Sequence, residues 1–130
     1  MGFEGGIMTN KILIADDEQN IVISLEFLMK REGFEVSIAQ DGEEAINRIR
    51  ADMPDLVLLD VMMPKRNGFE VCQEVKADPA LQAVKVLMLT AKGRDTEVTK
   101  GLALGADAYM TKPFSTKELV EKVRSLLSGI

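Results

Sequence analysis

Cysteine is almost absent from this 130-residue chain, which contains one, Cys72. A single thiol cannot form a disulfide within its own chain, so a scaffold held together by internal disulfides is excluded. Cys72 stands among Phe69, Val71 and Val75, which is typical of a small buried hydrophobic residue and not of a reactive thiol. This cysteine usage favours a reducing compartment, and we expect a cytoplasmic protein.

Long hydrophobic runs are absent as well. The longest aliphatic stretches, such as Leu56–Leu59, fall far short of the ~20 residues that cross a bilayer, so no membrane span is expected. The first ten residues, MGFEGGIMTN, contain neither Lys nor Arg and no apolar segment of useful length, unlike a secretory signal. We expect residues 1–8 to be a disordered or added leader, with Met8 as a possible natural start, and residues 9–130 to form a single domain.

Clusters of positive charge are also missing. The chain has 16 Lys and Arg against 21 Asp and Glu, which gives a net charge of −5. Because no group of Lys and Arg rises above the background of an ordinary helix surface, direct binding to nucleic acid or to an anionic membrane is not expected.

The sequence does contain a regular alternation of short apolar runs and segments of helical period. Five runs are predicted as strands: Lys11–Ala15, Phe34–Ala39, Asp55–Asp60, Val84–Thr90 and Asp107–Thr111. Each is followed by a predicted helix, and these helices cover about Ile21–Glu32, Asp41–Ala51, Gly68–Ala77, Asp95–Leu104 and Ser115–Leu127. Gly33 is predicted to end the first helix, and Asp41 and Ser115 are predicted N-caps. Glu44 and Glu118, each three residues later, are expected to complete capping boxes.

Strands such as Leu56–Leu59 are apolar without alternation, which is typical of a parallel sheet covered by helices on both faces. We therefore predict an α/β fold with a doubly wound, five-stranded parallel sheet of strand order 2-1-3-4-5, the flavodoxin-like (βα)5 arrangement. In that order the chain leaves strands 1 and 3 in opposite directions, and a crevice opens at their carboxyl ends. The functional site is expected there.

Polar residues gather at these carboxyl ends. The first strand is followed by Asp16 and Asp17, and the third, fourth and fifth lead to Asp60, Thr90 and Lys112. Three carboxylates at one edge would repel one another, and a hard divalent cation such as Mg2+ relieves that repulsion. Mg2+ in turn favours a phosphoryl ligand. The alternative is an ordinary surface ion pair between Lys112 and one of the acids, worth little.

These residues resemble the receiver domains of two-component response regulators, over about Lys11 to Leu127. The matching pieces are Asp16-Asp17, Asp60 in Asp-Val-Met-Met-Pro, Thr90-Ala91, and Lys112-Pro113-Phe114. The resemblance implies that Asp60 accepts a phosphoryl group from the phosphohistidine of a sensor kinase or phosphotransfer protein, or from a small donor such as acetyl phosphate. The chain has no histidine, so it cannot be its own phosphohistidine donor.

The resemblance also assigns roles to the neighbouring residues. It implies that Mg2+ is held by Asp17, Asp60 and the backbone carbonyl of Met62, with Asp16 acting through water. Lys112 and Thr90 would each contact a phosphoryl oxygen. The protein would be a signalling switch and not an enzyme in the ordinary sense, although it would catalyse its own phosphorylation and slow dephosphorylation.

Further features follow from the same resemblance. The Lys112–Pro113 bond is expected to be cis, although the residues alone also permit an ordinary trans proline. Thr90 and Tyr109 are expected to move together as a switch that alters the face formed by the fourth helix, fifth strand and fifth helix, which would dock an output domain or partner protein. The alternative for Tyr109 is a partly exposed strand aromatic. Met62 and Lys92 occupy positions that influence the lifetime of the phosphoryl group in such proteins.

Oligomeric state is left open at this point. Receivers of winged-helix transcription regulators often carry a second acid directly after the position of Asp107, as part of a dimer interface. Ala108 stands there in this chain, which argues against that dimer interface. Either a monomer or a phosphorylation-dependent dimer is expected.

Three other functions suit the same architecture. A flavin-binding electron carrier is disfavoured because Asp16-Asp17-Glu18 would repel the cofactor phosphate, and the chain has no Trp and one Tyr. A Mg2+-dependent phosphohydrolase usually has a general acid two residues after its nucleophilic Asp, where this chain has Met62. A degenerate receiver that only binds partners would not need the complete set of acids, Thr90 and Lys112.

Overall fold

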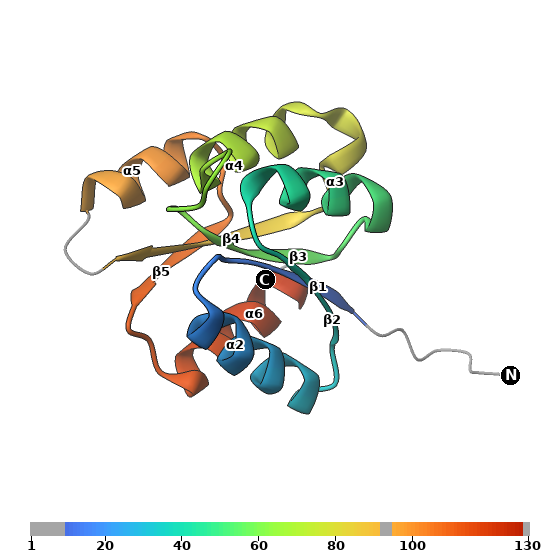
Figure 1. Cartoon of the computed structure of the whole chain (residues 1–130), viewed down its shortest axis with the longest axis vertical. Coiled ribbons are helices and arrows are strands. Elements are labelled where there is room, and N and C mark those ends of the chain that lie inside the picture. Colours follow the sequence, from blue (N-terminus) through green and yellow to red (C-terminus); the bar gives the residue numbers. More distant parts are fainter. Residues whose placement is uncertain (1–9, 92–94, 129–130) are drawn as a thin grey trace, which may run out of the picture.

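A five-stranded parallel sheet forms the middle layer of the protein (Figure 1). The computed structural model describes residues 10–91 and 95–128, with only the backbone of residues 95–98, so the expected leader and Lys92 lie outside the described residues. The strands are β1 (Lys11–Ala15), β2 (Glu35–Ala39), β3 (Leu56–Asp60), β4 (Lys85–Ala91) and β5 (Ala108–Lys112). Their order is β2-β1-β3-β4-β5, which confirms the predicted fold class and strand order.

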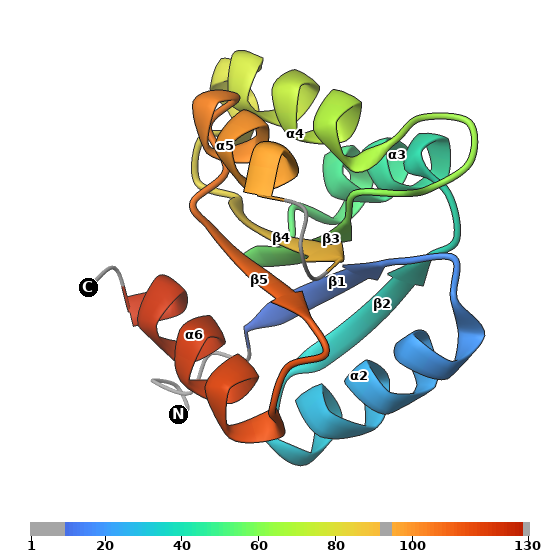
Figure 2. The same ribbon diagram turned by 90° about the vertical axis from the view of Figure 1, so that its left-hand side faces the viewer.

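Helices cover both faces of the sheet. They are α2 (Gln19–Arg31), α3 (Gly42–Asp52), α4 (Gly68–Ala77), α5 (Asp95–Ala103) and α6 (Thr116–Ser128). Figures 1 and 2 show α3, α4 and α5 on one face, and α2 and α6 on the other. No helix among the described residues is both long and apolar enough to cross a membrane.

The four strands after β1 each begin one residue later than predicted, and the residue directly before β3 and before β5 is an aspartate. Asp55 accepts a hydrogen bond at Oδ2 from the Lys11 amide (2.7 Å), and Asp107 accepts one at Oδ2 from the Val86 amide (2.7 Å). Each carboxylate thus satisfies the backbone of the neighbouring strand at the amino edge of the sheet. Asp107 also pairs with Lys76 Nζ at 2.8 Å, so this acid has partners within the chain.

The helix ends agree with the predicted caps except in four details. At α6 the Glu118 amide donates a hydrogen bond to Ser115 Oγ (3.0 Å) as predicted, but the Glu118 carboxylate accepts one from the Ser115 hydroxyl (3.0 Å). At α3 the Asp41 side chain accepts a hydrogen bond from the Glu44 amide (2.8 Å), as an N-cap does. The Glu44 carboxylate accepts its hydrogen bond from the Gln40 amide (2.8 Å), one residue before the cap, so the predicted capping box is incomplete. A complete capping box forms instead at α4, between Asn67 and Glu70. A short 3-10 helix, Pro79–Leu81, follows α4, where the sequence predicts only the end of the helix.

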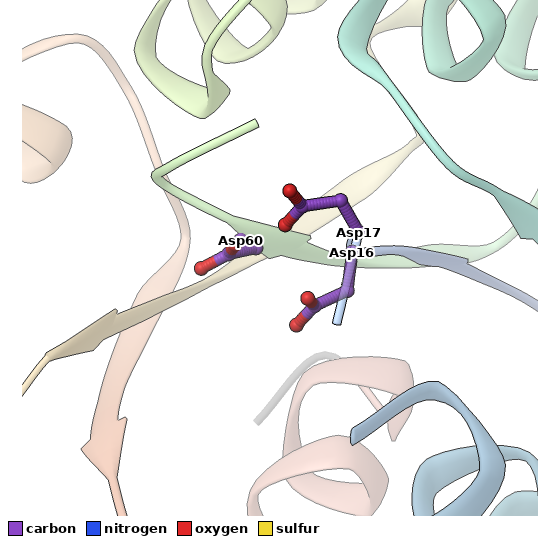
Figure 3. Close-up of side chains that lie close together, drawn as sticks. All are labelled: Asp16, Asp17 and Asp60. Carbon is purple, nitrogen blue, oxygen red and sulfur yellow. The ribbon is translucent and has the colours of Figure 1, made fainter. Parts of the chain in front are cut away.

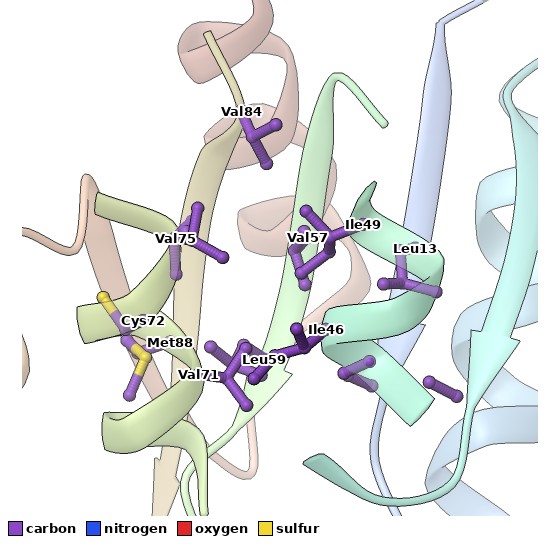
Figure 4. Packing of buried hydrophobic residues seen from close by; sticks show 14 of the residues in the cluster. Leu13, Ile46, Ile49, Val57, Leu59, Val71, Cys72, Val75, Val84 and Met88 are labelled. Atoms are coloured by element: carbon purple, nitrogen blue, oxygen red, sulfur yellow. The ribbon is translucent and has the colours of Figure 1, made fainter. Parts of the chain in front are cut away.

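The sheet divides the apolar core into two halves. Along β3, Val57 and Leu59 pack toward α3 and α4, whereas Leu56 and Leu58 pack toward α2 and α6. Both sets are fully buried, which is why this strand shows no alternation of polar and apolar residues. Figure 4 shows the first half of the core, which includes Cys72. Cys72 is fully buried, so it is a core residue as predicted, and this burial raises the pKa of its thiol to about 11.

Candidate functional site

The carboxyl ends of β1 and β3 bring three carboxylates together (Figure 3). One oxygen from each of Asp16, Asp17 and Asp60 lies within 4.8 Å of the other two. Asp16 and Asp60 are 0% and 5% exposed, whereas Asp17 faces solvent. Asp16 also accepts a hydrogen bond at Oδ1 from the Glu18 amide (2.9 Å), which turns the chain from β1 toward α2.

Lys112 places its amine inside this cluster. Its Nζ lies 3.1 Å from Asp16 Oδ2, 3.3 Å from Asp60 Oδ1 and 3.1 Å from Glu18 Oε1. Lys112 ends β5 opposite Ala91 of β4, and the Lys112–Pro113 peptide bond is cis, the isomer that the resemblance implied. Because the lysine side chain is only 17% exposed and touches two buried acids, this is not the ordinary surface ion pair of the alternative interpretation.

Burial dominates the electrostatics of the acids. It raises the pKa of Asp60 to about 6, and the negative charge of Asp16 adds to the rise. Lys112 and a backbone hydrogen bond from Met62 act in the opposite direction. Burial raises the pKa of Asp16 too, against the lowering effects of the Glu18 amide and of Lys112.

The neighbouring acids, and not burial, decide the direction in which the pKa of Lys112 shifts. Burial by itself lowers the pKa of the amine, but the charges of Asp60 and Asp16 outweigh that effect and raise the pKa to about 12. The lysine therefore stays protonated, and its one positive charge is set against two buried carboxylates and the nearby acids Asp17 and Glu18. The cluster remains short of positive charge.

Thr90 lies at the end of β4 and is 1% exposed. Its Oγ1 atom is buried and has no hydrogen-bond partner among the described residues. A buried hydroxyl without a partner costs free energy of about 1–3 kcal/mol, so this atom is suited to a group that enters the site. Tyr109, in contrast, lies on β5 with 42% of its surface exposed, and the Met62 side chain is 65% exposed.

The structure thus brings together Asp16, Asp17, Asp60 and Lys112, and leaves the side chains of Tyr109 and Met62 exposed. Sequence reasoning missed Glu18 as a partner of Lys112. The only available signal was that a third acid directly follows Asp16 and Asp17. Its approach to Lys112 depends on how the start of α2 lies relative to β5, which no local pattern encodes.

Comparison with known proteins assigns this arrangement to a family. Residues 12–124 match the response regulator receiver domain. The chain belongs to that family. Receiver domains are signalling switches of two-component systems, and phosphorylation and docking of an output domain are general to them. The assignment excludes the flavin-binding electron carrier as an interpretation of this fold.

A sequence relative supports this family assignment. The chain is 45% identical over 120 residues to the alkaline phosphatase synthesis transcriptional regulatory protein PhoP of Bacillus subtilis (strain 168). That match covers 92% of this chain and 49% of the PhoP relative, so the chain spans about half the length of that protein.

Solved structures show the same receiver architecture. Chemotaxis response regulator CheY4 of Vibrio cholerae has a TM-score of 0.85 and 28% identity, over 92% of this chain and 99% of CheY4. A CheY-like response regulator receiver domain protein from Methanospirillum hungatei JF-1 has a TM-score of 0.87 and 30% identity, over 94% of this chain and 96% of the other. A receiver domain implies a histidine kinase or another phosphodonor as its partner.

The raised pKa of Asp60 predicts a dependence of stability on pH in metal-free buffer. The ordinary value is 3.8 and the folded value is about 6, so the folded receiver binds this proton more tightly than the unfolded chain does. Stability should therefore fall as the pH rises through that interval. Asp60→Asn removes the contribution, and it should be more stable than the wild type by about 1–3 kcal/mol near pH 7.5, with little difference near pH 4.

Urea unfolding in EDTA at several pH values measures this difference. The informative quantity is the free energy of unfolding of the variant minus that of the wild type, since other titrating groups are common to both. A difference that does not grow between about pH 4 and about pH 7.5 would show that Asp60 ionises without a burial penalty.

Proposed function

We propose that Asp60 is the phosphoacceptor of this receiver and that its phosphorylation is the event that operates the switch. The position of the Asp60 carboxylate carries the proposal. It is almost fully buried at the end of β3, with a lysine amine 3.3 Å away and two more carboxylates beside it. Asp16 shares the burial, the Lys112 amine and the cluster, but its two carboxylate oxygens already accept hydrogen bonds from the Glu18 amide and from Lys112. Asp60 is also the acid that the receiver resemblance implies as the acceptor.

The acidic cluster fits a Mg2+ ion. It offers an all-oxygen donor set, which is the set that Mg2+ prefers, and the shortage of positive charge around Asp16 and Asp60 favours a divalent cation. Asp17, Asp60 and the Met62 carbonyl would hold the ion directly, and Asp16 through water. Bound Mg2+ would neutralise negative charge on the phosphoryl oxygens during transfer.

The chain's own residues supply the rest of the reaction. An Asp60 carboxylate oxygen forms a bond to phosphorus while the bond from phosphorus to the donor breaks, and the donor atom keeps that electron pair. Lys112 can exchange a carboxylate contact for a phosphoryl oxygen without leaving the site. The Thr90 hydroxyl, buried and without a partner among the described residues, can donate to another phosphoryl oxygen. The same site would later allow slow hydrolysis of the phosphorylated Asp60 side chain.

The 130 residues contain no histidine, so they cannot supply their own phosphohistidine. We propose a sensor histidine kinase or phosphotransfer protein as the physiological donor and acetyl phosphate as a small-molecule substitute. We propose that the protein is located in the cytoplasm, where both kinds of phosphodonor would be accessible to it.

The proposed output face consists of α5, β5 and α6. A groove lies there, lined among others by Leu102, Tyr109, Phe114 and Lys122. Tyr109 is exposed on this face, so inward movement of its ring on phosphorylation would change the surface that a partner meets. The relative PhoP is named as a transcriptional regulator, and an output domain of that kind is one candidate occupant. The chain would be a monomer or would dimerise on phosphorylation.

Saturating Mg2+ should raise the melting temperature, because it relieves the repulsion among the three carboxylates. Asp17→Asn removes one proposed ligand and should reduce the increase. Asp52→Asn is the matched control, since Asp52 lies on α3 outside the acidic cluster and should leave the increase unchanged. Differential scanning calorimetry in EDTA and in MgCl2 makes the comparison. An equal melting temperature of the wild type in both buffers would contradict the metal site.

Incubation with Mg2+ and acetyl phosphate should add one phosphoryl group to the wild type, detected as a change in intact mass. Asp60→Asn should show no adduct. Asp55→Asn removes an acid at the opposite end of β3 and should be phosphorylated like the wild type. An adduct on Asp60→Asn would place the acceptor elsewhere, and continuous turnover of a phosphoester without a stoichiometric adduct would favour a phosphohydrolase.

A further inference from the structure

We propose that Gly42 is a positioning residue for the acidic site, although it lies on α3 and is not part of the cluster. Through a close backbone contact it seats the segment between β3 and α4, residues 61–67, and so fixes the Met62 backbone beside Asp60. The inference rests on the proposed function, because the Met62 carbonyl matters only if the site binds Mg2+.

The absence of a side chain at Gly42 makes the contact possible. A Cβ atom added there would lie 2.5 Å from the carbonyl carbon of Arg66 and 2.7 Å from its Cβ, and closer still to its carbonyl oxygen. Carbon atoms attract each other at about 3.5–4.0 Å, so these approaches are strongly repulsive. Two of the three atoms belong to the backbone, and no flexible side-chain end can move aside. The segment around Arg66 would have to shift.

The same contact holds a strained turn. The Pro64 carbonyl accepts hydrogen bonds from the Gly42 amide (3.3 Å) and from the Arg66 amide (2.8 Å). Lys65, between Pro64 and Arg66, has a φ of 67°, a left-handed conformation that a lysine rarely adopts. A hydrogen bond across three residues with positive φ in the centre is the pattern of the strained γ-turn. Such a conformation persists only where the surroundings impose it, and Gly42 lies against both ends of this turn.

Side chains secure the same turn on two helices. The Lys65 amine lies 3.7 Å from Asp41 Oδ2 at the start of α3, and the Arg66 guanidinium pairs with Glu74 of α4. These contacts attach the turn to the α3–α4 layer of the protein and not to the acidic site itself.

Met62 connects this turn to the site. Its backbone lies beside the Asp60 carboxylate and lowers the pKa of that carboxyl, and its side chain is 65% exposed. The residues on either side of Met62 are held in place. The Val61 amide donates a hydrogen bond to the Leu89 carbonyl (3.2 Å), and the Val61 carbonyl accepts one from the Gly68 amide (2.8 Å). Met63 is buried. The Met62 backbone is therefore held by the residues on either side, and a shift at Pro64–Arg66 would be transmitted to it.

The main test is the Mg2+ affinity of Gly42→Ala, measured by isothermal titration calorimetry with MgCl2. Alanine forms helices better than glycine, so helix propensity alone would favour this variant. Displacement of the segment should instead weaken Mg2+ binding roughly tenfold or more, the range expected when a group that orients metal ligands is lost. Gly33→Ala is the matched control. Gly33 has a φ of 93° and no atom within 4 Å of an added Cβ, so alanine there strains the backbone without displacing the segment.

The control should lose thermal stability and keep the wild-type Mg2+ affinity, which separates positioning from general destabilisation. A Gly42→Ala protein with wild-type Mg2+ affinity would overturn the role of Gly42. If the wild type itself does not bind Mg2+, the metal site of the proposed function fails, and the role of Gly42 fails with it.

A second variant decides the question if Gly42→Ala lacks the wild-type circular dichroism spectrum. Lys65→Gly relieves the left-handed strain and leaves the contact at Gly42 intact, because that contact involves Arg66. It also removes the 3.7 Å contact with Asp41, which is worth little because the lysine side chain is exposed. If Gly42 holds the segment, Lys65→Gly should melt at a higher temperature and bind Mg2+ as the wild type does. Weaker Mg2+ binding by Lys65→Gly would show that the contact is not sufficient to hold the segment, which contradicts the proposal.

Discussion

The contact of one half-buried amine with two buried carboxylates is the interaction on which the site depends. Lys112 lies between Asp16 and Asp60 and partly offsets the cost of removing both charges from water. The compensation is incomplete, since the pKa of Asp60 remains raised to about 6. A site with unbalanced negative charge is a poor structural ion pair, but it is well suited to a divalent cation and to a phosphoryl group that brings oxygen ligands with it.

The fold creates this arrangement by its strand order. β1 and β3 are neighbours in the sheet although β2 separates them in the sequence, so Asp16 and Asp60 meet where their strands end. β5 carries Lys112 to the same edge from the far side of β4. The apolar residues on both faces of β3 fix the strand between two layers of helices, and this rigidity allows a costly cluster of charges to persist at its end.

Much of the fold and of the site could be predicted because the informative patterns are local. The continuous apolar strands indicated a parallel sheet, and the position of each polar residue at a strand end indicated a common edge. Glu18 could not be predicted as a partner of Lys112, since their contact depends on how α2 and β5 lie relative to each other. Asp55 and Asp107 were assigned to strands, but their carboxylates bind the amides of neighbouring strands. The crowding at Gly42 likewise arises from a segment more than twenty residues away in the sequence.

The most direct test of the electrostatic account is a titration of the aspartate side-chain carboxyl groups by carbon-13 NMR, in EDTA and in saturating MgCl2. In EDTA the resonance of Asp60, assigned by its absence from Asp60→Asn, should titrate near pH 6, as burial beside Asp16 requires. In MgCl2 its pKa should fall well below that value, because the cation stabilises the ionised form. An Asp60 carboxyl that titrates at the ordinary value of 3.8 in both buffers would contradict the account.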